Sequence, residues 1–344
     1  MIETAVIIAN WNGKKYLKDC FDSLRTQSYR DLKIILVDNG SEDGSADFLR
    51  DNYPETEIIR FEKNTGFCFG YNAGIKKALE DKAVSYILVL NNDIKLHEKF
   101  IENMINCSQR HPEAGSIQSK VLNFFEPDKI DCVGIVLARD GTAHNRGYGE
   151  IDNGQYENEE EIFGANATAV LYTRDSLEKT KLPGNNYFDR DHFVYYEDVD
   201  LAWRMRLAGF KAYLCPKARV WHVHSATAGK SSLFKAYYLH RNYFFTVFKN
   251  YPAGIMIKTL GWRFLSYVQL VFPVFKKEKR KTEFVKTCGK GKVAVAILQA
   301  WGSVIANIPS FIGKRRIIQK NKKVSRGEVR RWLRDYKVNF FDTF

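Results

Sequence analysis

The sequence has 344 residues, of which 45% are hydrophobic and 14% aromatic. This composition excludes a disordered chain, and the length suffices for one large α/β domain with an appendage. Six cysteines are scattered along the chain, and no pair has the close spacing of a zinc or redox motif. We therefore expect free thiols in a reducing compartment. An apolar strand follows directly after Met1-Ile2-Glu3, so we expect no secretory signal.

The net charge of +13 is concentrated at one end of the chain. Residues 231–344 carry 24 Lys and Arg against 5 Asp and Glu, a net charge of +19, whereas residues 1–230 have a net charge of −6. Aromatic and basic residues also begin to dominate near residue 230. We therefore place a domain boundary there and expect a polyanionic partner, lipid or nucleic acid, for the tail alone.

Short apolar runs alternate with helical patterns at the start of the chain. The expected strands and helices alternate in this order: 4–9, 14–26, 33–37, 45–52, 57–61, 70–81 and 86–90. Such alternation predicts βαβ units and a mainly parallel sheet. Ligands of these sheets bind beyond the carboxyl ends of the strands, so polar residues at those ends are candidates for a site.

The middle of the chain is less regular. Residues 140–160 are rich in Gly, Asn and Glu, and we expect a loop excursion there. Residues 163–173 are expected to form a strand and residues 197–207 a helix that ends before Gly209. Asp200 and Arg204 lie four residues apart in that helix, and we expect them to pair on its surface.

Two apolar stretches lie in the basic tail. Residues 253–275 precede a lysine-rich run, and residues 293–313 hold no charged residue and precede Lys314-Arg315-Arg316. The second stretch is long enough to span a bilayer, but its polar residues and proline make spanning poor. We favour helices that lie in the membrane interface with their basic flanks on anionic headgroups. A basic helical subdomain packed on the preceding domain is the alternative.

Polar residues follow the first two expected strands. Asn10-Trp11-Asn12-Gly13 follows the first strand, and Asp38-Asn39-Gly40 follows the second. A carboxylate at a strand end can accept a hydrogen bond from a base imide and so select a pyrimidine. Glycine lets the backbone approach a ligand closely. An ordinary turn is the alternative interpretation of Asp-Asn-Gly.

Two further clusters suit the phosphates of a nucleotide. Asn64-Thr65-Gly66 opens a helix that contains Asn72, and small or amide residues there suit a phosphate or sugar at a helix N-terminus. A plain helix-entry turn explains that cluster equally well. Asn91-Asn92-Asp93 directly follows a buried strand. A carboxylate at that edge can hold Mg²⁺ or Mn²⁺ against a diphosphate.

Acidic and histidine residues come together later in the chain. Glu197-Asp198 opens the expected helix, and we expect this helix to face the site at the carboxyl edge of the sheet. The alternative is that acidic residues at a helix start only interact favourably with the helix dipole. His222 and His224 form a His-x-His pair on an extended segment, which points both rings to one side. Such a pair suits a metal or a phosphate, and a structural pair is the alternative.

In this order, the clusters resemble those of family 2 glycosyltransferases of the GT-A fold, over roughly residues 3–245. The resemblance is nearest to the bacterial rhamnosyltransferase-like branch, and His240-Arg241-Asn242 adds to it. It implies a GT-A, nucleotide-sugar-binding, Rossmann-like α/β domain with a mainly parallel sheet in residues 1–230. Residues 231–344 would form a helical, basic, membrane-associating extension.

The resemblance also implies a role for each cluster. Asp38 contacts the nucleobase, and Asp198 is the catalytic base, supported by Glu197. Asp93 matches the last carboxylate of the metal-binding Asp-x-Asp signature, with His222 as a further metal ligand and His224 as its close alternative. The remaining residues expected to contact the donor are Asn10, Asn12, Asn64, Gly66, Asn72, Asn91 and Asn92. Asn91 stands where the signature has its first Asp, and it retains a ligand oxygen.

We therefore expect an inverting glycosyltransferase that uses Mg²⁺ or Mn²⁺ and moves a sugar from a nucleotide-sugar donor to a cell-surface or lipid-linked glycan. Thymidine-diphosphate rhamnose follows from the branch resemblance, and uridine-diphosphate hexoses or N-acetylhexosamines are the alternative donors. The expected location is the cytoplasmic face of an anionic membrane.

Two other classes of function compete with this interpretation. A non-catalytic membrane-binding module would use the basic tail alone. We expect no nucleic-acid partner, because apolar runs interrupt the charges of the tail. A dinucleotide oxidoreductase is disfavoured, since no Gly-x-Gly-x-x-Gly follows the first strand and no phosphate-loop motif is present.

Overall fold

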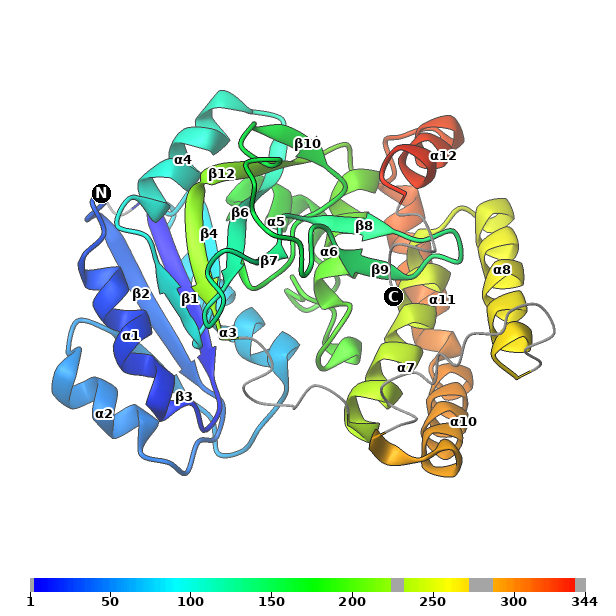
Figure 1. Ribbon diagram of the computed structural model, residues 1–344, viewed down its shortest axis with the longest axis horizontal. Coiled ribbons are helices and arrows are strands. Elements are labelled where there is room, and N and C mark those ends of the chain that lie inside the picture. Colours follow the sequence, from blue (N-terminus) through cyan, green and yellow to red (C-terminus); the bar gives the residue numbers. More distant parts are fainter. Residues whose placement is uncertain (1–2, 224–231, 272–286, 338–344) are drawn as a thin grey trace. The chain divides into compact units, whose positions relative to one another are not determined.

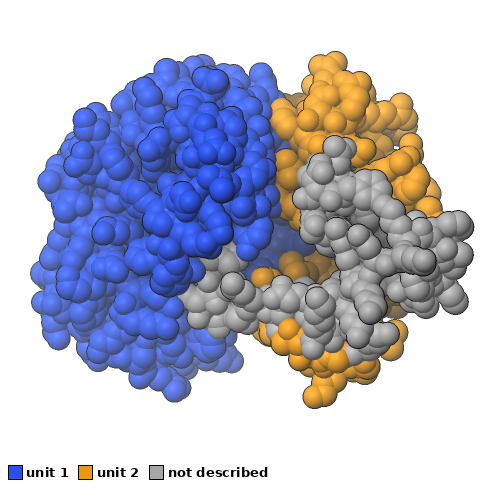
Figure 2. All heavy atoms as spheres, in the orientation of Figure 1, with its two compact units in different colours: residues 1–135, 145–227 blue, residues 136–144, 228–344 orange. Residues whose placement is uncertain are grey.

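The computed structural model describes residues 3–223, 232–271 and 287–337. The chain divides into two compact units (Figures 1 and 2). The first comprises residues 1–135 and 145–227, and the second comprises residues 136–144 and 228–344. The second unit thus includes a short excursion from the middle of the chain. The expected boundary after residue 230, between a catalytic domain and a membrane-associating region, stays a prediction.

The first unit is built on a ten-stranded sheet in the order β10-β12-β6-β11-β4-β1-β2-β3, with β5 paired to β12 and β7 paired to β6. The strands are β1 (Thr4–Asn10), β2 (Leu32–Asp38), β3 (Glu57–Arg60), β4 (Tyr86–Asn91), β5 (Ile94–Leu96), β6 (Ala114–Asn123), β7 (Ile130–Cys132), β10 (Glu160–Ile162), β11 (Ala169–Thr173) and β12 (Lys211–His222). Strands β3, β2, β1 and β4 run parallel, and β11 is antiparallel to both of its neighbours. The expected mainly parallel α/β fold is confirmed.

Alternation along β1 separates two apolar cores. Val6 and Ile8 belong to one core, Ala5 and Ile7 belong to the other, and all four are fully buried. The first core also takes residues of helices α1 (Lys14–Arg25), α2 (Ser45–Asn52) and α4 (Phe100–Arg110). The second takes residues of α3 (Phe67–Leu79), α5 (Arg174–Thr180) and α6 (Glu197–Leu207). Helices therefore cover both faces of the sheet, as parallel strands require (Figure 1).

Most expected elements match within a few residues, and α6 has the expected bounds. The strand expected over residues 163–173 is shorter, because β11 begins only at Ala169. The reason is a side-chain turn, in which Asn166 Oδ1 accepts hydrogen bonds from both the main-chain N and the hydroxyl of Thr168. The expected loop over residues 140–160 contains a short strand, β9 (Ala143–Asn145), which pairs with β8 (Ile135–Leu137). None of the six cysteines, all of which lie in the described ranges, forms a disulfide, as expected.

Apart from the excursion of residues 136–144, the second unit is helical in its described residues. Its helices are α7 (Leu233–Asn250), α8 (Ala253–Val271), α10 (Lys290–Ala306), α11 (Ile308–Lys320) and α12 (Arg326–Asp335). They hold the excursion of residues 136–144, since Tyr243 Oη donates to the carbonyl of Asp140 at 2.6 Å and the Arg263 guanidinium binds the Asp140 carboxylate at 3.0 Å.

The uncharged stretch of residues 293–313 is broken in two. A proline lies in the first turn of α11, where it cannot continue the hydrogen bonds of α10. In the described ranges, no one helix has the length and apolar composition to cross a bilayer. Helices α10 and α11 meet the criterion only as a pair, and that pair is bent by 62°.

A pair of glycines in α3 provides a test of the core. A Cβ on Gly74 would lie 2.4 Å from Cγ2 of Ile7, whereas a Cβ on Gly70 would meet its neighbours at 3.6 Å or more. We expect Gly74→Ala to lower the free energy of unfolding by about 1–2 kcal/mol, because overpacking outweighs the gain in helix propensity. Gly70→Ala should leave it unchanged or raise it by up to about 1 kcal/mol. Urea unfolding followed by tryptophan fluorescence measures both, and equal midpoints would contradict the packing of α3 on β1.

Candidate active site

The ends of β1 and β2 share one hydrogen-bonded network. Ser41 Oγ accepts hydrogen bonds from Asn10 Nδ2 at 3.2 Å and from the main-chain N of Asn12 at 3.0 Å. The main-chain N of Ser41 in turn donates to Asp38 Oδ1 at 3.2 Å. Asn10 and Asp38 are register partners in the parallel pair β1 and β2. The structure thus brings together Asn10, Asn12 and Asp38, as the expected nucleotide site requires.

One carboxylate oxygen in this network has no hydrogen-bond donor. Asp38 is fully buried, and its Oδ2 has no hydrogen-bond partner among the described residues. The nearest charged group is the Arg60 guanidinium, whose Nε lies 3.4 Å away in an ion pair. A buried carboxylate oxygen without a donor is costly, by about 1–3 kcal/mol, so a ligand N–H would be favoured there. This geometry suits the expected contact of Asp38 with a base imide.

The entry to α3 is held by the side chain of Asn39. Its Nδ2 donates to Asn64 Oδ1 and to the carbonyl of Gly66, both at 3.1 Å, while its Oδ1 accepts from the main-chain N of Thr65 at 2.9 Å. Gly66 has φ +86°, and a Cβ there would lie 2.4 Å from the ring of Phe193. Asn64 and Gly66 therefore fix the loop that leads into α3 and fit it against Phe193.

Asn72 lies one turn further along α3, and its amide is already engaged. Its Nδ2 donates to the carbonyl of Phe188 at 2.7 Å, and its Oδ1 accepts from the main-chain N of Phe188 at 2.8 Å. Asn72 therefore anchors the segment that precedes α6. Its contact with the donor stays a prediction.

The residues after β4 connect to the same network. Asn92 Nδ2 donates to Asn10 Oδ1 at 2.6 Å. A Cβ on Gly13 would lie 2.1 Å from Asn92 Nδ2 and 2.5 Å from Asn10 Oδ1, so only glycine leaves room for this bond. The nucleotide cluster and the Asn91-Asn92-Asp93 cluster are thus one assembly at the carboxyl edge of the sheet.

Asp93 and His222 meet as expected, and a third residue supports them. Asp93 Oδ1 lies 3.4 Å from His222 Nε2, and both side chains are buried. His222 Nδ1 lies 2.6 Å from Asp131 Oδ2 on β7. Asn91 Nδ2 also lies 3.4 Å from His222 Nε2. Burial disfavours the charged imidazole, but the hydrogen bonds and charges of Asp131 and Asp93 outweigh it and raise the pKa of His222 to about 9. His224 lies outside the described residues.

Asp198 is held by the residues that precede β11. Its Oδ2 accepts hydrogen bonds from Asn166 Nδ2 at 3.0 Å and from the main-chain N of Ala167 at 3.4 Å. The next residue, Thr168, uses its carbonyl to accept from the main-chain N of Asn91 at 2.8 Å. The tripeptide of residues 166–168 therefore binds Asp198 at one end and the backbone of Asn91 at the other, which connects the expected base to the cluster of expected metal ligands.

The two acidic residues of α6 differ in their surroundings. Glu197 is buried, and its Oε2 has no hydrogen-bond partner among the residues described. Burial, and then the charge of Asp198, raise the pKa of Glu197 well above its ordinary value. Burial also raises the pKa of Asp198, against hydrogen bonds from the main-chain N–H groups of Val199 and Ala167. A raised pKa makes a carboxylate a better proton acceptor near neutral pH, because its pKa comes closer to the pH at which it acts.

A strained segment leads into α6. Phe193, Tyr195 and Tyr196 have φ of 64°, 66° and 67°, in the left-handed region that bulky residues rarely adopt. Each such residue costs on the order of 1–3 kcal/mol, and the surrounding structure must hold it in place. The main-chain N of Cys68 donates to the carbonyl of Phe193 at 3.1 Å, so α3 supplies part of this support.

Buried polar and charged residues near this strained segment also help to hold it in place. Asp189, His192 and Asp200 are buried and offer ligand atoms within 4.8 Å of one another. Arg204 Nε donates to Asp200 at 2.9 Å, and the same guanidinium donates to the carbonyls of Thr180 and Tyr187. The expected pairing of Asp200 with Arg204 is therefore present, but the expectation that it lies on the helix surface is wrong. The pair is buried because it ties α6 to the chain that precedes the strained segment.

Several residues of the site carry no sequence motif. Asp131, Asn166, Arg60 and Phe193 act through partners 22 to 127 positions away. Single-sequence patterns reveal neither such pairings nor unusual backbone geometry. The one available signal was the density of turn-forming residues around Asn166, which interrupts an apolar run.

Comparison with known proteins agrees with the geometry. An N-acetylglucosaminyl-diphospho-decaprenol L-rhamnosyltransferase of Mycobacterium tuberculosis is 24% identical over 251 residues, which cover 65% of this chain and 77% of the relative. A poly-β-1,6-N-acetyl-D-glucosamine synthase of Staphylococcus epidermidis is 23% identical over 226 residues, which cover 65% of this chain and 50% of the relative.

The crystal structure of S. aureus TarS 1–349 in complex with UDP matches 96% of this chain and 91% of its own, with a TM-score of 0.53 and 15% identity. This likeness confirms the expected GT-A fold. The family model "Glycosyl transferase family 2" matches residues 5–180, which hold the two nucleotide-site strands and the Asn91-Asn92-Asp93 cluster. The chain therefore belongs to glycosyl transferase family 2.

Proposed function

We propose that this glycosyltransferase inverts the anomeric carbon of its sugar, requires a divalent cation and acts on a lipid-linked glycan at a membrane surface. The observation that carries the catalytic part is the position of Asp198. Asn166 and Ala167 hold this carboxylate, and the adjacent Thr168 binds the backbone beside Asp93. A base and a set of cation ligands are therefore connected through the tripeptide of residues 166–168.

The chemistry is a single displacement at the anomeric carbon. Asp198 takes the proton of the acceptor hydroxyl as the new C–O bond forms and the bond to the donor diphosphate breaks. Such general-base catalysis contributes about 10²–10⁴-fold. Glu197 lies next to the base in the sequence, and we propose that it supports Asp198. A single displacement needs no nucleophile from the protein, and inversion follows.

The ligand set at Asp93 suits a cation bound together with a diphosphate. Asp131 Oδ2 lies 2.6 Å from Nδ1 of His222, so Nε2 is directed at Asp93. Histidines that bind a metal through one ring nitrogen commonly have the other held by a carboxylate in this way. One carboxylate and one imidazole leave the remaining positions to phosphate and water, which is how Mg²⁺ and Mn²⁺ bind at diphosphate sites. A cation held by Asp93 and His222 would stabilise the negative charge of the leaving nucleoside diphosphate.

The relatives supply the support for the substrates. We propose thymidine-diphosphate rhamnose as the donor, because a relative that covers 65% of this chain is named an L-rhamnosyltransferase. The name of that relative also supports a polyprenyl-diphosphate-linked acceptor. Uridine-diphosphate N-acetylhexosamine is the second candidate donor, because a similar share of the chain matches a poly-N-acetylglucosamine synthase.

The exposed residues of the second unit support the membrane surface. One face of α10 is buried, at Val293, Ala296, Ala300 and Val304, and α10 packs against α7. Its other face is apolar and exposed, with Leu298 70% and Ile305 65% accessible. Exposed apolar side chains continue into α11, which also carries the basic run that begins at Lys314. An apolar face beside basic residues suits the interface of an anionic bilayer, and we place it at the cytoplasmic side.

The base assignment is tested with Asp198→Asn. We expect turnover to fall at least about 10²-fold while the affinity for the donor stays near normal, since a base acts in the transition state. Release of nucleoside diphosphate is measured over thymidine-diphosphate rhamnose and several uridine-diphosphate sugars, with membrane extract as the acceptor. Asp175→Asn, at an exposed carboxylate of α5, is the control. Near-normal turnover of Asp198→Asn would remove it as the base, and no turnover of any donor by the wild type would favour a non-catalytic membrane module.

The cation site is tested with Asp131→Asn. Loss of the carboxylate that holds Nδ1 of His222 should raise the Mn²⁺ concentration needed for half-maximal activity about 10–100-fold. Much of the rate should be regained at saturating Mn²⁺. Asp128→Asn changes an exposed carboxylate three residues away and should leave this concentration unchanged. An equal Mn²⁺ requirement in both variants would place the cation elsewhere.

The membrane surface is tested by sedimentation with vesicles of phosphatidylglycerol and phosphatidylcholine. The double variant Leu298→Asp, Ile305→Asp should bind at least tenfold more weakly than the wild type, because each side chain gains about 1.5–3 kcal/mol from full burial. Ile151→Asp, at an exposed apolar residue of the first unit, should bind as the wild type does. If the double variant also matched the wild type, α10 would not be the surface that contacts lipid.

A further inference from the structure

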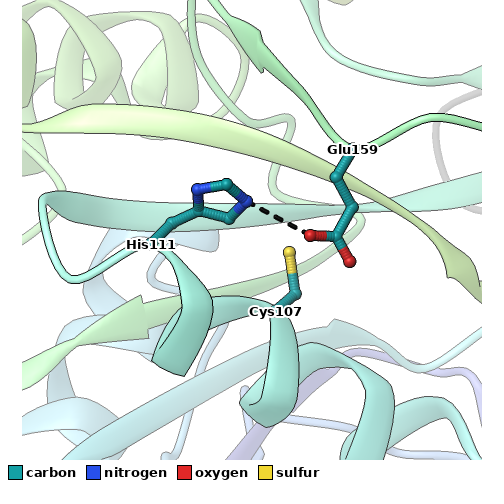
Figure 3. Close-up of side chains that lie close together, drawn as sticks. All are labelled: Cys107, His111 and Glu159. Atoms are coloured by element: carbon teal, nitrogen blue, oxygen red, sulfur yellow. Dashed lines mark hydrogen bonds and ion pairs between the residues drawn. The ribbon is translucent and has the colours of Figure 1, made fainter.

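A second group of metal-ligand side chains lies in the first unit. Cys107 and His111 are one turn apart on α4, and Glu159 directly precedes β10. The Cys107 sulfur, a ring nitrogen of His111 and a carboxylate oxygen of Glu159 all lie within 4.8 Å of one another. Figure 3 shows the His111 ring and the Glu159 carboxylate facing each other, with the Cys107 sulfur directed at the space beside them.

Strand β12 brings a second cysteine to this group. The Cys215 sulfur donates to the carbonyl of Asn103 at 3.4 Å, and Asn103 lies one turn before Cys107 on α4. Two residues earlier on the same face of β12, the Tyr213 ring stacks on His111 with a centroid distance of 3.8 Å. The residues 213 and 215 of the strand therefore face the residues 111 and 107 of the helix.

We propose that Cys107, His111, Glu159 and Cys215 form a zinc site. Two sulfurs, one imidazole and one carboxylate are four ligands of the types that Zn²⁺ binds in closed tetrahedral sites. The two thiolates and the carboxylate carry three negative charges against the two positive charges of the ion. Arg110, whose guanidinium binds the Glu159 carboxylate through Nε at 3.2 Å and through a second nitrogen, supplies the balancing charge.

The site is separate from the donor site. His111 precedes β6, and Cys215 lies in the first half of the parallel strand β12, whereas His222 ends β12. The register partners of Cys215 and His222 on β6 are Ser119 and Asn123, four residues apart, because an irregularity between Cys215 and Arg219 takes up extra residues of β12. Four residues of strand correspond to roughly 13 Å. A zinc ion there would join α4, β12 and the residue before β10, so we assign it a structural role in the first unit.

Zinc binding at two cysteines has a measurable signature. A cysteine thiol is ordinarily protonated near neutral pH. Zinc binds thiolates, so binding must release the protons of the thiols it takes. The bonds that form are two Zn–S, one Zn–N and one Zn–O. The two thiol protons pass to the solvent.

The experiment is a titration of the reduced, metal-free full chain with Co²⁺ and with Zn²⁺. We expect one tightly bound ion per chain, the visible bands of tetrahedral cobalt, a thiolate-to-cobalt charge-transfer band and release of about two protons per ion. Cys107→Ser and Cys215→Ser should each weaken binding at least tenfold and reduce the charge-transfer band. Cys288→Ser, at a thiol of the second unit, is the matched control and should behave as the wild type does.

Two more variants keep the result interpretable. His111→Ala removes a ligand from a half-exposed position, so the fold should tolerate it even if a cysteine variant does not. Zinc should raise the Tm of the wild type by more than that of His111→Ala. Asp93→Ala should keep the charge-transfer band, because the Asp93 site offers no sulfur. Absence of that band in the wild type, or equal affinity in Cys107→Ser, Cys215→Ser and Cys288→Ser, would overturn the proposal.

Discussion

The parallel register of β1, β2 and β4 determines where the chemistry of this protein lies. Asn10 is the register partner of Asp38, and Ala9 is the register partner of Asn91, so the three strands end at one edge. The register is itself fixed by burial on both faces, because a shift of one residue would exchange the residues of the two apolar cores. Polar residues placed after each strand must then meet, and the Asn92–Asn10 hydrogen bond at 2.6 Å is one result.

The buried polar groups at this edge fall into two kinds. Most satisfy one another, as Asn39 does with the loop before α3 and Asn72 does with Phe188. Two carboxylate oxygens, Asp38 Oδ2 and Glu197 Oε2, have no hydrogen-bond donor in the described part of the chain. Satisfied groups make the site rigid, whereas unsatisfied ones cost stability and mark where a ligand would gain the most. The segment before Glu197 has strained backbone, which lowers stability. Contacts with α3 and with the buried Asp200–Arg204 pair hold this segment in place.

Much of the fold could be predicted from the sequence, because its signals are local. The strands before Asn10, Asp38 and Asn91 have short apolar runs that end in turn residues, and α6 is bounded by acidic residues and Gly209. The site was predictable only where a motif lies at the end of such an element. Asp131 and Asn166 have no such marker, because their roles depend on partners brought close by the antiparallel pairing of β7 with β6 and of β11 with β4. Cysteine spacing likewise does not reveal that Cys215 lies against α4, because this contact depends on the packing of α4 on β12.

The charge of the first unit supplies a physical reason for a cation in the proposed mechanism. The donor is anionic, yet residues 1–230 carry a net charge of −6, and the carboxylates of Asp93 and Asp131 lie on either side of His222. The α3 N-terminus contributes only about half an elementary charge. The Arg60 guanidinium is already paired with Asp38, 3.4 Å away, and the His222 imidazole is already paired with Asp93 and Asp131. Attraction of a diphosphate to this edge therefore needs a positive charge that these groups do not supply, and Asp93 with His222 is the place in the site where the chemistry of the ligands suits a divalent cation. Among the described residues of the tail, the basic run that begins at Lys314 lies on α11 near exposed apolar side chains, which suits a lipid surface better than a diphosphate.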